Sequence, residues 1–252
     1  MTAITRTQVL SYGGGTQTVA MCLLARDGVL PRPDRIVMAD TGREGSATFD
    51  YLENFMRPAL ETEGMRIEIA PHSLATVDLY SLKQSTLVIP AFTATGKFKT
   101  YCSNEWKSSV NERYLRSQGI RAATFWIGYT IDESKRIKGY GESPWFRRYP
   151  LVELMLTRSD CEQVIYRRGL PKPPKSACWM CPHRTNAEWR FLRDEQPSDF
   201  EQACVVDEEI RENDEYHAVY LHEQRVPLRD ADLEAKDRGE RKPQCGLGNC
   251  FL

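Results

Sequence analysis

The chain of 252 residues is long enough for one large domain, or for one domain with a sizeable appendage. Hydrophobic residues make up 41% and charged residues 27%, ordinary values for a globular protein with a real core. With 34 Lys and Arg against 35 Asp and Glu, the net charge of -1 provides no global field for nucleic acid or a membrane surface. No run is apolar enough for a signal peptide or a membrane span, so we expect a cytoplasmic protein without a membrane partner.

The first half of the chain alternates between strand-like and helix-like segments. Short apolar runs predict strands at 7–12 (TQVLSY), 34–40 (DRIVMAD), 65–71 (MRIEIAP) and 123–130 (ATFWIGYT). Helical spacing of apolar residues predicts helices at 18–29 (TVAMCLLARDGV) and 46–61 (SATFDYLENFMRPALE). Strands that alternate with helices are typical of a parallel sheet, so we predict an α/β fold with the sheet sandwiched by helices.

The composition of the sequence changes from about Pro144 onward. Prolines interrupt this part at several positions, and the long charged span 186–213 has a helical pattern. We therefore predict an α/β domain over residues 1–143 and a mostly helical, cysteine-bearing C-terminal part over residues 144–252 that packs on it.

Three consecutive glycines stand between the first predicted strand and the first predicted helix. Gly13, Gly14 and Gly15 let backbone N–H groups converge on an anion, and the helix N-terminus adds partial positive charge. Thr16 and Thr18 supply hydroxyl groups at the same place. Neither GxxxxGK[ST] nor GxGxxG is satisfied, and the glycines taken alone also fit a flexible surface turn.

Six segments, in order, resemble parts of one family. The segment GGGTQT (13–18) resembles the PP-loop of ATP pyrophosphatases, usually written SGGxDS, with Gly13 and Gln17 replacing the serine and the aspartate. Further segments resemble those of the phosphoadenosine phosphosulfate (PAPS) reductase branch: MADTGREGSATFDYLENF, YCSNEWK, GYTIDESKR, RRYPLVEL and ACWMCP. This resemblance, over residues 7–192, implies an adenine nucleotide alpha hydrolase-like fold.

The resemblance also implies a nucleotide site. The PP-loop would cradle the pyrophosphate of ATP or the phosphosulfate of PAPS, and the end of the second strand would face the adenosine. Arg136 would supply a cation to the phosphates, although its spacing fits an exposed helix arginine equally well. Gln17 removes a carboxylate that could contact Mg²⁺, which leaves Asp40 or Glu44 as replacements and magnesium as an open question. The cofactor-binding residues expected on this basis are Gly13, Gly14, Gly15, Thr16, Gln17, Thr18, Asp40, Thr41, Gly42 and Arg136.

The eight cysteines point to metal or redox chemistry, because disulfide frameworks are rare in the cytoplasm. The motif Cys178-Trp-Met-Cys181 fits a redox pair, a zinc site or an iron–sulfur cluster. The resemblance favours a [4Fe–4S] cluster held by Cys102, Cys178 and Cys181, with one iron left open or bound from elsewhere. The tail segment QCGL resembles a reductase tail with a nucleophilic cysteine, so we assign catalysis to Cys245 and the fourth metal ligand to Cys250. The opposite assignment of these two tail cysteines is almost equally good.

Two enzyme classes and one binding class follow from these features. The first choice is an ATP-dependent sulfur transferase that adenylates its substrate, releases pyrophosphate and inserts sulfur from a donor protein or free sulfide. Its acceptor would be a nucleic acid such as tRNA or DNA, and whether the protein forms a homodimer is left open. The alternative is a PAPS or adenylylsulfate reductase that uses Cys245, and a third class is a nucleotide-binding protein without catalysis. A single cysteine at Cys102, followed by Ser103, favours sulfur transfer because the reductases often carry two cysteines there.

Overall fold

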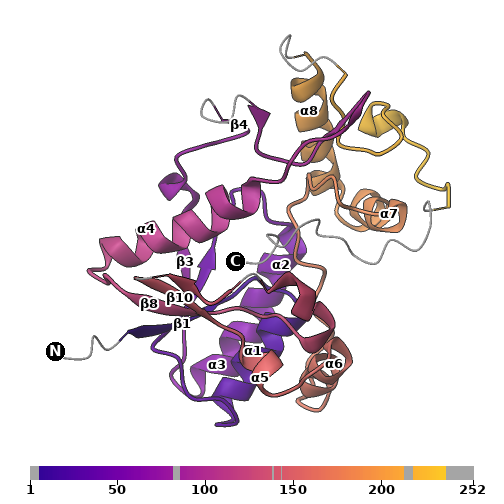
Figure 1. Ribbon diagram of the computed structural model, residues 1–252. Helices are drawn as coiled ribbons and strands as arrows, with labels where there is room; N and C mark the ends of the chain where they lie inside the picture. Colours follow the sequence, from indigo (N-terminus) through magenta and orange to yellow (C-terminus); the bar gives the residue numbers. More distant parts are fainter. Residues whose placement is uncertain (1–5, 82–85, 138, 143, 213–217, 237–252) are drawn as a thin grey trace.

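The computed structural model describes residues 6–81, 86–137, 139–142, 144–212 and 218–236. Its centre is a sheet with the strand order β3-β2-β1-β8-β10-β9 (Figure 1). The five strands from β3 to β10 are parallel, and β9 is antiparallel to β10. In chain order these strands are β1 (Thr7–Ser11), β2 (Arg35–Ala39), β3 (Ile67–Ala70), β8 (Ala123–Trp126), β9 (Gly141–Glu142) and β10 (Trp145–Arg148). The predicted α/β class with a parallel sheet is confirmed.

The strands read as apolar runs because both faces of the sheet are covered. In β1, Leu10 points into a core on one face and its neighbour Val9 points into a second core on the other face. In β2, Met38 and Val37 divide between the same two cores in the same way. Burial of both faces therefore replaces the alternation of apolar and polar residues that a half-exposed strand shows.

Helices cover both faces of the sheet (Figure 1). One face carries α1 (Thr16–Arg26), α3 (Arg57–Glu61) and α6 (Arg158–Tyr166), and α1 packs against both of the others. The other face carries α4 (Ser109–Ser117), which packs on β2 and β3. The helix predicted at 46–61 forms as α2 (Ser46–Tyr51), a π-helical turn (Leu52–Met56) and α3. A second π-helical turn (Asn104–Ser108) leads into α4, and α5 (Pro150–Glu153) follows β10.

A separate hydrophobic core joins the C-terminal helices to an insertion from the first half of the chain. Helices α7 (Asn186–Glu195) and α8 (Pro197–Glu212) pack together, and their core includes Leu87, Trp106 and Leu221. The insertion holds two hairpins, β4 (Tyr80–Ser81) with β5 (Thr86–Leu87) and β6 (Phe92–Thr93) with β7 (Gly96–Lys97), and the second lies beside α8 (Figure 1). Three short 3₁₀ turns complete the described elements: His72–Leu74, Ile131–Arg136 and Leu228–Asp230.

The domain boundary predicted near residue 143 marks a change in the sequence, but elements from both sides of it pack together. β10 lies in the sheet beside β8, and α6 packs on α1, so residues 145–166 lie with the α/β part. In the other direction, Phe92 exchanges two main-chain hydrogen bonds with Tyr220, at 2.8 and 2.9 Å, so the insertion lies with the C-terminal helices. As folding units, 1–143 and 144–252 remain a proposal. Among the described residues, no helix is both long enough and apolar enough to cross a lipid bilayer.

Asp207 of α8 holds the loop that follows this helix. Its side chain is 1% exposed and accepts hydrogen bonds from the N–H groups of Leu221 and Leu228, each at 2.8 Å, and it pairs with Arg211. Replacing Asp207 with Ala leaves two buried N–H groups without this acceptor, which costs about 1–3 kcal/mol for each group. We expect Asp207→Ala to lower the free energy of unfolding by about 2–6 kcal/mol in urea denaturation. The exposed Glu209→Ala on the same helix is the control and should change it by less than about 0.5 kcal/mol; equal losses would contradict the assignment.

Asp160 gives the stability of α6 a defined pH dependence. The Thr157 hydroxyl donates to Asp160 at 2.6 Å and the Thr157 N–H donates at 2.8 Å, and these bonds lower the pKa of Asp160. A carboxylate with a lowered folded-state pKa stabilises the fold above its unfolded pKa of about 3.9 and loses this effect as the pH falls through the folded value. We therefore expect Asp160→Asn to lower the melting temperature at neutral pH, and the difference from wild type to shrink below about pH 4. A difference that stays constant in thermal melts across this range would refute the account, and the exposed Asp50→Asn serves as the control.

Candidate functional site

The glycine loop joins β1 to α1 at the carboxyl edge of the sheet. The helix begins after Gly15 without a side-chain cap and carries no acidic residue in its first turn. Its first N–H groups have no intrahelical acceptor and, together with the helix dipole, form a site that attracts an anion. The loop is held from within, because the Gly13 N–H donates to the Thr18 hydroxyl at 3.2 Å and this hydroxyl donates to the Gly15 carbonyl at 3.1 Å. These two hydrogen bonds fix the loop at the start of α1.

Two glycines in the site allow close approach of neighbouring segments. Gly14 has φ +76°, and a Cβ at this position would lie 2.3 Å from Cγ2 of Thr48 in α2. Gly128 follows β8, and a Cβ there would lie 2.9 Å from Cγ2 of Thr18. Gly14 belongs to the predicted PP-loop. Thr48 was missed in the sequence, and Gly128 was noticed only as the first residue of GYTIDESKR.

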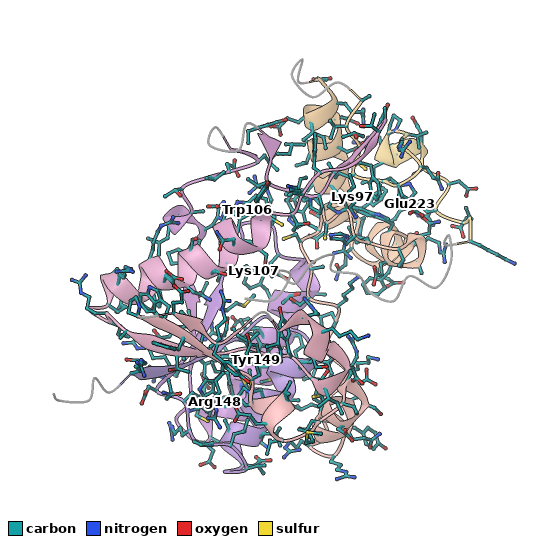
Figure 2. The ribbon with its side chains drawn as sticks, in the orientation of Figure 1. Lys97, Trp106, Lys107, Arg148, Tyr149 and Glu223 are labelled. Carbon is teal, nitrogen blue, oxygen red and sulfur yellow. The ribbon has the colours of Figure 1, made fainter. Side chains whose placement is uncertain are left out.

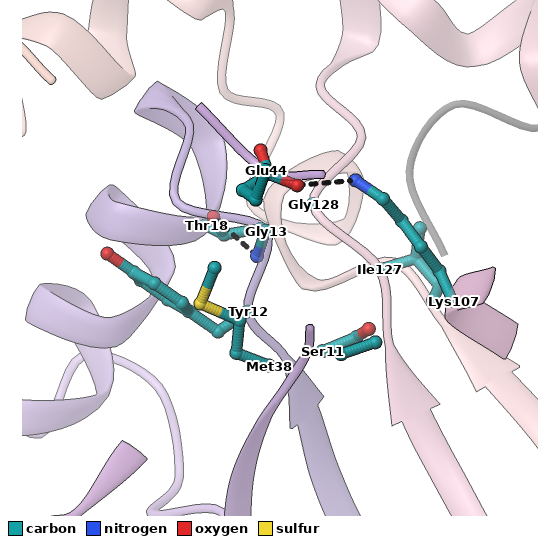
Figure 3. A pocket seen from close by; sticks show the side chains of 10 residues that line it. Ser11, Tyr12, Gly13, Thr18, Met38, Glu44, Lys107, Ile127 and Gly128 are labelled. Atoms are coloured by element: carbon teal, nitrogen blue, oxygen red, sulfur yellow. Dashed lines mark hydrogen bonds and ion pairs between the residues drawn. The ribbon is translucent and has the colours of Figure 1, made fainter. Parts of the chain in front are cut away.

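A pocket opens between the ends of β1 and β8, where the strand order of the sheet reverses. Parallel α/β sheets bind ligands at such a switch point. The pocket is a small cleft that is partly open to solvent. Its walls are formed by Ser11, Tyr12, Gly13, Thr18, Met38, Ala39, Glu44, Lys107, Ile127 and Gly128 (Figure 3). Two of the predicted nucleotide-binding residues, Gly13 and Thr18, are among them.

A buried ion pair stands in the pocket wall. Lys107 comes from the π-helical turn before α4, at the junction of the sheet and the C-terminal part (Figure 2), and Glu44 comes from the segment after β2. Their side chains are 13% and 1% exposed, and Lys107 Nζ lies 3.5 Å from Glu44 Oε2 (Figure 3). The other carboxylate oxygen, Oε1, lies 3.1 Å from the hydroxyl of Ser176, which also contacts the Gly13 carbonyl. The sequence offered no signal for Ser176, since 163 residues separate it from Gly13.

The segment 40–42 lies beside the pocket and turns toward the cysteines. Asp40 accepts a hydrogen bond from the Gly42 N–H at 2.7 Å, and Gly42, at φ +66°, packs against the ring of His72. Thr41 is fully buried, and its hydroxyl lies 3.5 Å from the sulfur of Cys178. A role of these residues toward adenosine stays a prediction.

Gln17 and Arg136 meet at one carboxylate. The Gln17 amide donates to Glu133 Oε2 at 3.0 Å, and Arg136 pairs with the other oxygen of the same carboxylate. The Arg136 guanidinium also lies over the ring of Tyr129, 4.6 Å from its centroid, and the side chain is 17% exposed. Arg136 is thus a partly buried residue of a 3₁₀ turn, and its charge is balanced by Glu133. Its predicted contact with phosphate stays a prediction.

Three cysteines gather next to the pocket. Burial raises the pKa of Cys178 to about 12 and also raises that of Cys102, and the two thiols together with Cys181 are close enough to affect one another electrostatically. The charge of Lys107 lowers the pKa of both Cys102 and Cys178. Between Cys178 and Cys181, the side chains of Trp179 and Met180 are buried in the C-terminal core and anchor the loop. Cys22, Cys161 and Cys204 lie in the hydrophobic cores, whereas Cys245 and Cys250 lie outside the described residues.

The described cysteines do not converge on a single ion. In the described part of the chain, no three His, Cys, Asp or Glu side chains come close enough together to hold one metal ion. A [4Fe–4S] cubane is larger than one ion and spreads its thiolate ligands further apart. The Ser103 hydroxyl beside Cys102 is buried and has no hydrogen-bond partner among the described residues, so it can donate to an acceptor such as a cluster sulfur. A metal site or cluster at Cys102, Cys178 and Cys181 stays a prediction.

Comparison with known proteins finds distant similarity in structure and none in sequence. No protein-family model matches the chain, and no curated protein matches it in sequence. A crystal structure of phosphoadenylyl-sulfate (PAPS) reductase from Candida auris, in a phosphate complex, is similar with a TM-score of 0.46 and 12% identity over 70% of this chain and 83% of that chain. The U34-tRNA thiolase NcsA from Methanococcus maripaludis, with its [4Fe-4S] cluster, is similar with a TM-score of 0.46 and 12% identity over 82% of this chain and 72% of that chain.

The effect of a side chain at Gly14 can be compared with that at Gly28, a glycine with the same backbone conformation. Gly28 has φ +75°, and a Cβ added there would meet nothing within 4 Å, so Gly28→Ala adds backbone strain without a steric clash. Gly14→Ala adds the same strain and a clash with Thr48, so we expect it to cost about 2–4 kcal/mol of stability against about 1 kcal/mol for Gly28→Ala. Calorimetry with ATP should show binding in Gly28→Ala and at least a tenfold loss in Gly14→Ala. Because Thr48→Ser removes only the Cγ2 methyl, the double variant Gly14→Ala with Thr48→Ser should recover stability; no recovery would show that the clash is not the cause.

Proposed function

We propose that the protein is an ATP-dependent sulfur transferase that activates an acceptor at the glycine loop and delivers sulfur from the neighbouring cysteine site. One observation carries this proposal: a single segment, 41–44, touches both places. Its Thr41 hydroxyl lies 3.5 Å from the Cys178 sulfur, and three residues later Glu44 lines the pocket below the glycine loop. A chemistry that needs an activated phosphoester and a sulfur atom side by side fits this arrangement.

The chain supplies the groups that activation needs. The N-terminus of α1 and the Lys107 ammonium face the pocket from two sides and would stabilise negative charge on phosphate oxygens. In this step an oxygen of the acceptor attacks the α-phosphorus of ATP, and pyrophosphate leaves. Met38, Ala39 and Ile127 give the pocket apolar walls, which would limit the access of water to the adenylated acceptor.

The cysteine loop supplies the second half of the reaction. Sulfide held there would attack the carbon that carries the adenylate, so that a C–S bond forms and AMP leaves, and a bound [4Fe–4S] cluster would supply the place that holds the sulfide. Cys102, Cys178 and Cys181 would hold this cluster, and the anchored side chains of Trp179 and Met180 fix two of these ligands relative to the pocket. Lys107 couples electrostatically to Cys102 and Cys178 as well as to Glu44, so it would favour the thiolate form that a metal requires.

A sulfonate reductase is the second candidate, and Gln17 is the observation that favours it. Its amide donates to Glu133, so this position offers no carboxylate to a metal–triphosphate complex. Reduction of PAPS needs no cleavage of pyrophosphate and tolerates that loss. The predicted nucleophile of this reaction, Cys245, lies outside the described residues.

The two candidates differ in the product that they release. We expect pyrophosphate from ATP only in the presence of an acceptor, tested with bulk tRNA and then with duplex DNA, and transfer of radiolabelled sulfide to the same acceptor. Cys178→Ser should abolish the sulfur transfer and leave ATP affinity within about threefold.

Lys107→Met removes a charged contact to phosphate and should weaken ATP binding about 10- to 100-fold, while the exposed Lys172→Met should not. Release of sulfite from PAPS with thioredoxin, lost in Cys245→Ser, would instead establish the reductase.

A further inference from the structure

Two exposed arginines lie on aromatic rings of β10 and not on carboxylates. The Arg6 guanidinium lies over the ring of Phe146, 4.0 Å from its centroid, and the Arg116 guanidinium lies over the ring of Trp145, at 4.9 Å. Neither arginine forms an ion pair with a carboxylate in the described part of the chain, whereas Arg229 pairs with two glutamates. A ring, unlike a carboxylate, accepts few of the five N–H donors of a guanidinium, so most of them remain available to a ligand.

Two further arginines lie at the same place. Arg147 belongs to β10 itself and is half-buried, without an ion pair to a described carboxylate. Arg121 is exposed and lies two residues before Ala123, the residue of β8 that pairs with Trp145. We call this set of side chains the β10 surface: Arg6, Arg116, Arg121, Trp145, Phe146 and Arg147.

Acidic side chains offset only part of this charge. Glu112 of α4 is close enough to Arg116 and Arg147 for their charges to lower its pKa, although burial has the larger effect and raises it. Glu142 of β9 is exposed beside the surface. Asp34 directly precedes β2, on the other side of β1, where it accepts a hydrogen bond from a main-chain N–H of β1. With four arginines against two nearby carboxylates, the β10 surface carries net positive charge, although the whole chain has a net charge of -1.

The chemistry of these side chains fits a nucleic acid. The forked donors of a guanidinium match the oxygens of a phosphate, and its flat face can stack on a base. A nucleic acid offers both phosphates and bases, whereas an acidic peptide or a lipid surface offers negative charge without a flat ring. Contacts between arginine and the phosphate backbone also supply most of the affinity in binding that is independent of sequence.

Strand β10 leads from this surface to the pocket. Trp145 lies at its start, and Arg148 lies three residues later, about 10 Å along the strand. The Arg148 carbonyl accepts a hydrogen bond from the N–H of Ile127 at 2.9 Å, and Ile127 lines the pocket beside the glycine loop. Figure 1 shows β10 next to β8 in the sheet. A chain bound along β10 can therefore reach the pocket.

We propose that the β10 surface binds the phosphodiester backbone of a nucleic acid, with Arg6, Arg116 and Arg147 in contact with phosphates, and holds it beside the pocket. This inference rests on the proposed function where it takes the bound nucleic acid to be the sulfur acceptor. The binding itself requires neither ATP nor sulfur chemistry, so it is measured separately from the reaction.

Fluorescence anisotropy with labelled single strands of RNA and of DNA, in the same mixed sequence and without ATP, measures this binding. We expect Arg6→Gln and Arg116→Gln each to weaken it about threefold to tenfold, and each to reduce the slope of log K against log salt concentration by about 0.7. The control is Arg66→Gln, because Arg66 is exposed and directly precedes β3 at the opposite edge of the sheet. It should leave the affinity within about twofold and the slope unchanged. Thermal melts check the fold, and Arg121→Gln replaces either variant if that variant does not fold.

The β10 surface is refuted if the wild type binds neither strand, or if Arg66→Gln weakens binding as much as the two variants do. It is also refuted if phosphatidylserine vesicles bind with this arginine dependence and the strands do not. Tighter binding of one strand identifies RNA or DNA as the ligand.

The reaction separates this inference from the proposed function. With the acceptor that accepts sulfur, we expect the double variant Arg6→Gln with Arg116→Gln to raise KM for the acceptor at least tenfold and to leave kcat within about twofold. An unchanged KM would refute the surface and leave the sulfur transferase intact. Arginine-dependent binding of a strand without release of pyrophosphate or transfer of sulfur would refute the proposed function and leave the surface intact.

Discussion

The arrangement of the site depends on a short antiparallel pairing of main-chain groups between residues 43–45 and residues 177–179. The Trp179 N–H donates to the Arg43 carbonyl at 2.9 Å, and the Gly45 N–H donates to the Ala177 carbonyl at 3.3 Å. The first segment follows β2 in the sheet, and the second is anchored in the C-terminal core through Trp179. These bonds are directional, so they fix the distance between the glycine loop and the thiols.

The same junction makes the two hydrophobic cores interdependent. Ser176 contacts the glycine loop from the cysteine side, and Asp199 of α8 accepts a hydrogen bond from the Ser46 N–H at the start of α2, at 2.8 Å. A carboxylate at a helix N-terminus stabilises that helix, so α8 supports α2. Helix α2 in turn places Thr48 against Gly14. Contacts between packed groups therefore connect the cysteine loop and α8 with the glycine loop.

The sequence predicts the local part of this design well. The apolar runs locate the strands, and the glycines between a strand and a helix locate the loop, because strands, helices and tight turns are encoded by neighbouring residues. The junction is not local: Ser176 and Glu44 are 132 residues apart, and neither has a pattern that announces the other. The place of β10 was also missed, since its residues Trp145–Arg148 mix aromatic and basic side chains at the sheet's less buried edge. Likewise, the pairing of Gln17 with Glu133 depends on two loops that meet only after the sheet has formed.

The charges in the site are better explained by ligand binding than by stability. A buried ion pair contributes little net stability, because removing both charges from water offsets their attraction. Glu44 and Lys107 nevertheless lie in the wall of a pocket, 3.5 Å apart. Two apolar side chains could occupy the same space without the cost of removing two charges from water. The separation of Glu44 and Lys107 is also long for an ideal charged hydrogen bond, so each can exchange this partner for a ligand group without a large loss. Around them, Glu133 balances Arg136 and Asp40 caps its own turn, so the charges that the described residues present to a ligand are those of Glu44, Lys107 and the start of α1. The described residues thus place one carboxylate, one ammonium and the positive end of one helix around a single pocket.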